Sequence, residues 1–302
     1  MFTKYIKSEC IVNNFKMFVA TYFNTNSFFC EGIMGVEKIL DEGSRKIYKS
    51  RNPSLFSILV RAAFKWIINS RLGIWFLHLC AEANSYSTIE SLVQHGADVD
   101  AAGKEGNTIL HIASIFGYTE IVDIVVVRTK NINARNIYGN TPLHLAVKYK
   151  HLDIMQTLLR FGANFNCLNC LGQSPLHLAV QYADRVILGL LIKKGASLEV
   201  KNKEGSTPLL LAVSLNKKDH VELLLQNRAN VNTIGRDGCT PLHLAVMNGN
   251  EEIVELLLSR KANVYLRCFY NSEEGYTALE NAIADKNKEI IKLFLLYGIT
   301  LG

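Results

Sequence analysis

Five histidines are spaced in a way that raises the question of metal binding or proton transfer. They are separated by 33 residues or by twice that number, at His78, His111, His144, His177 and His243. A zinc ion needs all of its ligands within about 2.1 Å of one point. Histidines carried by successive packed units instead lie about 10 Å apart, the distance between neighbouring helices. The spacing therefore favours a structural role over a metal site.

The pair Cys167 and Cys170 has the Cys-x-x-Cys spacing, which can chelate zinc or cycle between thiol and disulfide. No second pair accompanies it, and it falls in a predicted turn, whereas the redox motif stands at the start of a helix. The seven cysteines are an odd number without framework spacing, which favours free thiols in a reducing compartment. The sequence also lacks a phosphate-binding loop and a nucleophile elbow. We therefore expect no enzyme activity, no cofactor and no metal.

The elements that carry these residues repeat with a fixed period. The tetrapeptide TPLH at 141–144 returns as SPLH at 174–177 and TPLH at 240–243, and a glycine precedes it every 33 residues from Gly106 to Gly238. A period of this length indicates a supersecondary unit that is stabilised by stacking on copies of itself. The hydroxyl residue and the proline predict a helix start, and glycines such as Gly162 and Gly195 predict the end of a second helix.

The pattern GxTPLHxA, followed by a helix that ends in LLxxGA(D/N)xN, resembles the ankyrin repeat. The resemblance covers residues 70–302 as about seven units, the first degenerate around Gly73 and the last preceded by a four-residue insertion before Gly275. It implies an all-α ankyrin-repeat solenoid in which the histidines bond to backbone between units. We expect the last unit to act as the C-terminal cap.

Three units lack the glycine that ends the second helix and have Thr129, Arg228 or Lys261 in its place. A side chain in the left-handed conformation of that position costs about 1 kcal/mol. The sequence therefore predicts that Thr129→Gly raises the unfolding midpoint.

Residues 1–69 do not match the repeat and form a basic, apolar extension. Residues 1–72 carry 11 Lys and Arg against 5 Asp and Glu, whereas the remainder carries 22 of each. Apolar spacing over 54–68 predicts a helix that caps the first unit. The alternative is a segment that binds a membrane surface or nucleic acid. We expect no signal peptide and no membrane-spanning helix, and hence a cytoplasmic location.

Function in a solenoid depends on side chains that stacking does not use. By register with the family's contact positions, these lie ten residues after each motif glycine and at the turn tips. The last two units have Asn248 and Asp285 at the first of these positions. The predicted partner-binding residues are Phe116, Ile137, Tyr138, Tyr149, Leu171, Tyr182, Leu215, Arg135 and Lys148. Leu168 also lies at a tip, and Lys201 and Lys203 extend the basic rim.

The resemblance implies a scaffold or adaptor that binds a protein or peptide in the concave groove. The apolar centre and basic rim predict a partner surface that is apolar with some acidic charge, and we expect the chain to be monomeric, with no small-molecule substrate. The alternative is that these side chains only pack on a neighbouring helix or on residues 1–72. Ankyrin-like proteins rich in Asn, Ile and Lys, as this one is, are common among factors that intracellular microbes deliver into host cells. An effector role is thus expected by analogy.

Overall fold

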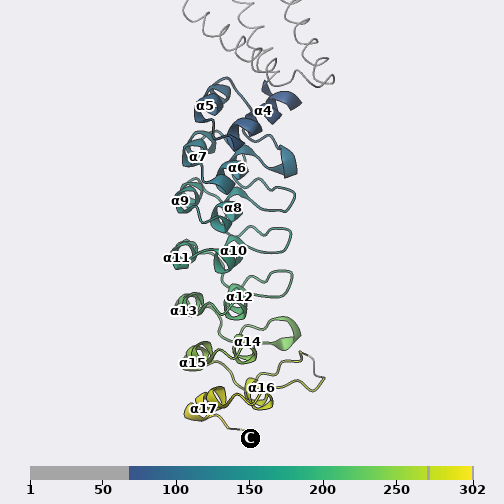
Figure 1. Cartoon of the computed structure of the whole chain (residues 1–302), viewed down its shortest axis with the longest axis vertical. Coiled ribbons are helices and arrows are strands. Elements are labelled where there is room, and N and C mark those ends of the chain that lie inside the picture. Colours follow the sequence, from purple (N-terminus) through teal and green to yellow (C-terminus); the bar gives the residue numbers. More distant parts are fainter. Residues whose placement is uncertain (1–67, 271–272, 301–302) are drawn as a thin grey trace, which may run out of the picture. The chain divides into compact units, whose positions relative to one another are not determined.

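The structure is a computed structural model that describes residues 68–270 and 273–300. In this part the chain forms seven pairs of antiparallel helices and one isolated antiparallel bridge (Figure 1). The pairs are α4 (Arg71–Glu82) with α5 (Tyr86–Gln94), α6 (Ile109–Phe116) with α7 (Thr119–Val126), α8 (Pro142–Lys148) with α9 (Leu152–Arg160), α10 (Pro175–Tyr182) with α11 (Arg185–Lys193), α12 (Pro208–Ser214) with α13 (Lys218–Gln226), α14 (Pro241–Met247) with α15 (Glu251–Ser259), and α16 (Ala278–Ala284) with α17 (Lys288–Leu296).

The predicted all-α repeat solenoid is confirmed. Two short 3-10 turns, Lys104–Gly106 and Arg236–Gly238, complete the regular structure of the described residues. The helix expected over 54–68 and the basic residues of the extension lie outside the described residues, apart from the last residue of that range and Arg71.

The first helix of each pair begins at a side-chain cap, as the TPLH motif predicts. In α8 the Thr141 hydroxyl accepts the backbone N–H of His144, and the His144 ring nitrogen Nδ1 accepts the backbone N–H of Thr141 at 3.2 Å. Pro142 occupies the first helical position, where a missing N–H costs nothing. This reciprocal pair satisfies two of the donors that a helix start leaves unpaired.

The helices stack in two columns (Figure 1). The column of first helices runs from α4 through α6, α8, α10, α12 and α14 to α16, and the column of second helices runs from α5 to α17. Each helix contacts its own partner, the first helices contact one another in order from α4 to α16, and the second helices do so from α5 to α9 and from α11 to α17. Apolar side chains such as Leu143, Ile154 and Leu158 are completely buried between these layers. The hydrophobic core is therefore a continuous strip along the stack rather than one central cluster.

A second set of contacts joins the ends of the second helices. A side-chain oxygen from one unit accepts a backbone N–H of the next at 2.7–3.0 Å. The acceptors recur every 33 residues, at Asp100, Asn133, Asn166, Glu199 and Asn232. These bonds satisfy donors just beyond the helix ends and tie neighbouring units together.

The expectation for Thr129 is wrong. Its backbone is not left-handed, whereas Arg228 and Lys261 do have the expected left-handed backbone, with φ of 68° and 61°. The Thr129 hydroxyl donates to the Asp100 carboxylate, and its backbone N–H bonds to Val125 at 3.0 Å. The end of α7 is thus closed by a side chain of the preceding unit, without a left-handed residue.

We accordingly expect Arg228→Gly and Lys261→Gly, and not Thr129→Gly, to stabilise the fold. At Gly162 and Gly195, which hold the same position in other units, an added Cβ would meet nothing within 4 Å. The cost at Arg228 and Lys261 is therefore one of backbone conformation. Replacement by glycine removes this cost, and glycine's greater freedom in the unfolded chain offsets part of the gain. The net increase in the free energy of unfolding should be about 0.5–1 kcal/mol. Urea denaturation measures the gain; a loss of stability in both variants would contradict it.

The structure also differs from the expectation of seven free thiols. Cys239 and Cys268 form a disulfide, with their Cα atoms 4.5 Å apart. Cys268 also pairs with Tyr276 in the isolated bridge, through two backbone hydrogen bonds of 2.9 Å. Sequence spacing missed this pair because its separation of 29 residues spans two units that only stacking brings together. The free cysteines of the described part are Cys80, Cys167 and Cys170.

Candidate partner-binding surface

The five repeated histidines link each unit to the next. The Nε2 of each ring lies 2.9–3.1 Å from a backbone carbonyl of the following unit, at Asn107, Asn140, Gln173, Ser206 and Tyr276. In four of the units Nδ1 accepts the backbone N–H of the capping residue, so Nε2 carries the proton and donates. His78 differs, because its Nδ1 lies 2.7 Å from the carbonyl of Ile74.

Burial keeps four of these rings, those of His111, His144, His177 and His243, neutral. It lowers the pKa of His111 and His144 to about 4, against weaker opposing effects of their backbone hydrogen bonds, and it lowers the pKa of His177 and His243 as well. With both nitrogens occupied, the rings have no free position for a metal ion or a transferred proton. Their predicted structural role is confirmed.

The Cys-x-x-Cys pair lies at a turn tip, as expected. The backbone N–H of Cys170 donates to the carbonyl of Tyr138 at 2.9 Å, in the tip of the preceding unit. Burial raises the pKa of the Cys167 thiol, with the Arg135 charge opposing it. A reactive or metal-binding cysteine needs the opposite shift. Within 68–270 and 273–300, no three His, Cys, Asp or Glu side chains are grouped so that they could hold a metal ion.

The turn tips form a continuous edge of hydrogen-bonded loops. Ile137 donates its backbone N–H to the carbonyl of Glu105, and Lys203 donates to that of Leu171, both at 3.0 Å. The Arg135 guanidinium donates to the carbonyl of Leu168 at 2.7 Å, so this predicted rim residue also braces two tips. Ile137 and Leu171 remain exposed at the edge (63% and 62%). The edge therefore presents apolar side chains on a fixed backbone.

A buried asparagine holds the shape of each central tip. The Asn136 side-chain oxygen accepts the backbone N–H groups of Tyr138 and Asn140, at 3.1 and 3.0 Å, and its amide donates to Asn107 at 2.9 Å. Asn169 makes equivalent bonds in the next unit. Sequence reasoning missed these positions, although Asn136, Asn169 and Asn202 recur with the period of 33.

Four consecutive units have an apolar or aromatic residue ten positions after the motif glycine, and we call these four residues the apolar stripe. It consists of Phe116, Tyr149, Tyr182 and Leu215, all exposed, at the C-terminal ends of α6, α8, α10 and α12. The Lys148 ammonium lies 5.5 Å from the centre of the Tyr149 ring and 5.7 Å from that of Tyr182. This position between two ring systems permits cation–π attraction to both. The Lys148 ammonium therefore interacts with both tyrosine rings.

The nine predicted site residues thus fall into two groups. The tip residues Arg135, Ile137, Tyr138 and Leu171 lie near the starts of the first helices, whereas Lys148 and the apolar stripe lie at their ends. A helix of seven residues separates the groups by about 10 Å. The structure places them along two borders of the first-helix column rather than in one patch.

Comparison with known proteins agrees with this architecture. A family model of ankyrin repeats, which spans three copies, matches residues 77–169, 158–235, 176–268 and 233–302. The chain is an ankyrin repeat protein. Its closing unit is included in the last of these matches, in spite of the insertion before Gly275.

A solved structure with a similar fold is the ankyrin repeat domain of Bcl-3, described as a unique member of the IkappaB protein family. It is 27% identical to this ankyrin repeat protein, with a TM-score of 0.66, over 72% of this chain and 97% of that one. None of the curated proteins is significantly similar to the sequence. Among the described helices of this ankyrin repeat protein, none combines the length and the apolar character that a membrane span needs.

Proposed function

We propose that the protein is a non-catalytic scaffold or adaptor that binds a protein or peptide through the first-helix side of its repeat stack. Ankyrin repeats are general protein-interaction modules, and the family match covers most of the chain. The observation that carries the proposal is the pair Tyr149 and Tyr182, which stay exposed in consecutive units with the Lys148 ammonium between their rings.

Exposed apolar area and a rigid backbone support this surface as a binding site. Four consecutive units each expose a large apolar side chain at the same position, and tyrosine is among the residues that dominate binding energy in interfaces. The stripe sits on helices that are packed on both sides. A surface that is already ordered loses little entropy on docking.

The charges suggest the chemistry of the partner. Arg135, Lys148, Lys201 and Lys203 give the central units a basic margin beside the apolar groups. A partner with an apolar surface and some acidic charge complements this margin, and such complementarity favours fast and specific association. Delivery into a host cell and the monomeric state remain predictions from the sequence.

We expect the double variant Tyr149→Ser/Tyr182→Ser to lose its partner. Truncating a central tyrosine of an interface costs about 2 kcal/mol or more, which weakens binding at least about thirtyfold. Quantitative co-purification from cell lysate, with mass spectrometry of the proteins retained by the full chain and by the variant, measures the loss. Circular dichroism verifies that the variant is folded.

The matched control is Tyr265→Ser/Tyr297→Ser, which removes two exposed tyrosines away from the stripe. A protein that is lost with the first variant and kept with the control supports the proposal. If every partner is recovered equally with all three chains, the stripe is only packing and the proposed surface is wrong.

A further inference from the structure

The four-residue insertion before the last unit builds a structure that the other units lack. Its two ends are held together by the bridge between Cys268 and Tyr276, and the Arg267 guanidinium donates to the carbonyl of Gly275 at 2.8 Å. The disulfide from Cys239 fixes the same end to the preceding unit. The lengthened loop thereby carries Tyr270 out beside the end of α14.

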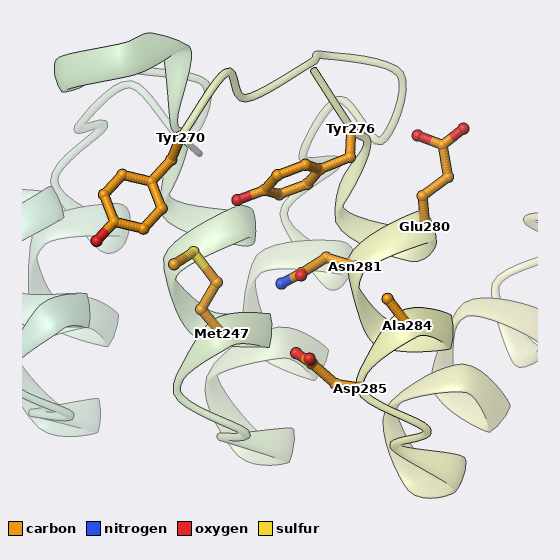
Figure 2. Close-up of a pocket in the computed structure, with 7 residues that line it drawn as sticks. All are labelled: Met247, Tyr270, Tyr276, Glu280, Asn281, Ala284 and Asp285. Atoms are coloured by element: carbon orange, nitrogen blue, oxygen red, sulfur yellow. The ribbon is translucent and has the colours of Figure 1, made fainter. Parts of the chain in front are cut away.

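Tyr270 and the closing unit line a pocket that is open to solvent, seen in Figure 2. Its volume of about 580 Å³ is in the range of small-ligand sites. Met247 comes from the end of α14, and the two tyrosines come from the two ends of the inserted loop. The rest come from α16 and from the residue that caps its C-terminal end. The lining residues are Met247, Tyr270, Tyr276, Glu280, Asn281, Ala284 and Asp285.

The two carboxylates of the pocket differ in their partners. Glu280 accepts the backbone N–H of Thr277 at 2.7 Å and lies 3.7 Å from the Arg267 guanidinium, and its carboxylate points away from the other lining side chains in Figure 2. Asp285 points towards them, and it makes no ion pair with any residue in the described part of the chain. The pocket therefore offers one unpaired negative charge beside two tyrosine rings.

A second polar side chain without a partner, an amide, also lines the pocket. The side-chain nitrogen Nδ2 of Asn281 is buried and has no hydrogen-bond partner within the described residues. A buried donor left unpaired costs about 1–3 kcal/mol, which an incoming acceptor would recover. The pocket thus presents a carboxylate that can accept hydrogen bonds from a cation and an amide that can donate to a carbonyl oxygen.

We infer that this pocket binds an arginine side chain of an extended peptide segment in a partner protein. The planar guanidinium can stack on a tyrosine ring and form two parallel hydrogen bonds with the Asp285 carboxylate. The carbonyl of the same peptide is an acceptor for Asn281. A lysine supplies a charge without a flat face, so arginine is the better fit.

This inference does not rest on the proposed function. The pocket is formed by the sixth and seventh units, whereas Tyr149 and Tyr182 belong to the third and fourth. The apolar stripe does not extend to the pocket, because Asp285 occupies in the seventh unit the position that holds Tyr149 and Tyr182 in theirs. The two surfaces can therefore be tested separately.

The test is calorimetric titration of the full chain with the blocked pentapeptide GGRGG and with the same peptide carrying citrulline, which keeps the shape of arginine and removes its charge. We expect the arginine peptide to bind about tenfold more tightly. Asp285→Asn should reduce this ratio to near one, and Tyr270→Ala should weaken binding of the arginine peptide.

Glu255→Gln is the matched control, since it removes an equal charge from the exposed surface of α15, outside the pocket, and should leave the ratio unchanged. The variant Tyr149→Ser/Tyr182→Ser should leave it unchanged as well. The inference is overturned if neither peptide binds at millimolar concentration, if both bind equally, or if the preference survives Asp285→Asn.

Discussion

Acidification from pH 7 to pH 4 should remove about 6 kcal/mol from the free energy of unfolding through two buried histidines. Burial lowers the pKa of His111 and of His144 to about 4, from an ordinary value of 6.5. Between these values the unfolded chain is protonated at both rings and the folded chain is not. Their contribution is therefore complete above pH 6.5 and is lost as the pH falls towards 4, at about 3 kcal/mol for each ring.

Urea denaturation at pH 7, 5.5 and 4, followed by circular dichroism, measures this slope. The control is His144→Leu, because Leu210 already occupies the same position in another unit. This variant should be less stable at pH 7, since it leaves the carbonyl of Gln173 without the imidazole donor, yet it should depend less on pH. A pH dependence identical to that of the original chain would show that the ring does not titrate as argued.

Gly139→Ala should destabilise the fold by about 3 kcal/mol, much more than Gly162→Ala. Both glycines have a left-handed backbone, with φ of 72° and 85°. An added Cβ at Gly139 would lie 2.7 Å from the backbone nitrogen of Cys170 and 2.8 Å from the Arg135 guanidinium, whereas one at Gly162 would meet nothing within 4 Å. Gly162→Ala therefore costs the backbone strain of about 1 kcal/mol, and Gly139→Ala adds the clash between neighbouring tips.

Thermal and urea unfolding of both variants measures the difference. Amide hydrogen exchange at Cys170 adds a local readout, because the clash must lengthen its 2.9 Å bond to the carbonyl of Tyr138. Equal losses in the two variants would mean that the tips move apart freely, and would contradict the close approach described above.

The period of 33, together with the resemblance of its motif to the ankyrin repeat, was enough to predict the fold, because each unit repeats the same local signals. The hydroxyl caps, the proline at the first helical position and the helix-ending glycines act within a few residues, so one sequence shows them directly. The spacing of the histidines argued against a metal site, and the resemblance to the ankyrin repeat implied their bonds to backbone between units.

Contacts that depend on a particular neighbour could not be predicted in this way. Thr129 escapes a left-handed backbone because Asp100 of the preceding unit accepts its hydroxyl. Cys239 and Cys268 meet only when two units stack, and Tyr270 reaches its pocket only through the lengthened loop. The exposure of eight of the nine predicted site residues could be read from the register, whereas Lys148 is half-buried. The separation of the two groups along the length of a helix depends on where each helix begins and ends.

Because each repeat packs only against the repeats next to it, the stack can open at a single junction. If one junction opens, as a clash at Gly139 would favour, the chain divides into two shorter stacks that each keep most of their own contacts. Each fragment then exposes a fresh face lined by buried leucines such as Leu143 and Leu176. The face on one fragment is complementary to the opposite face of the same junction on another molecule, so partial opening at high concentration should lead to end-to-end exchange between chains and to oligomers of ordered units.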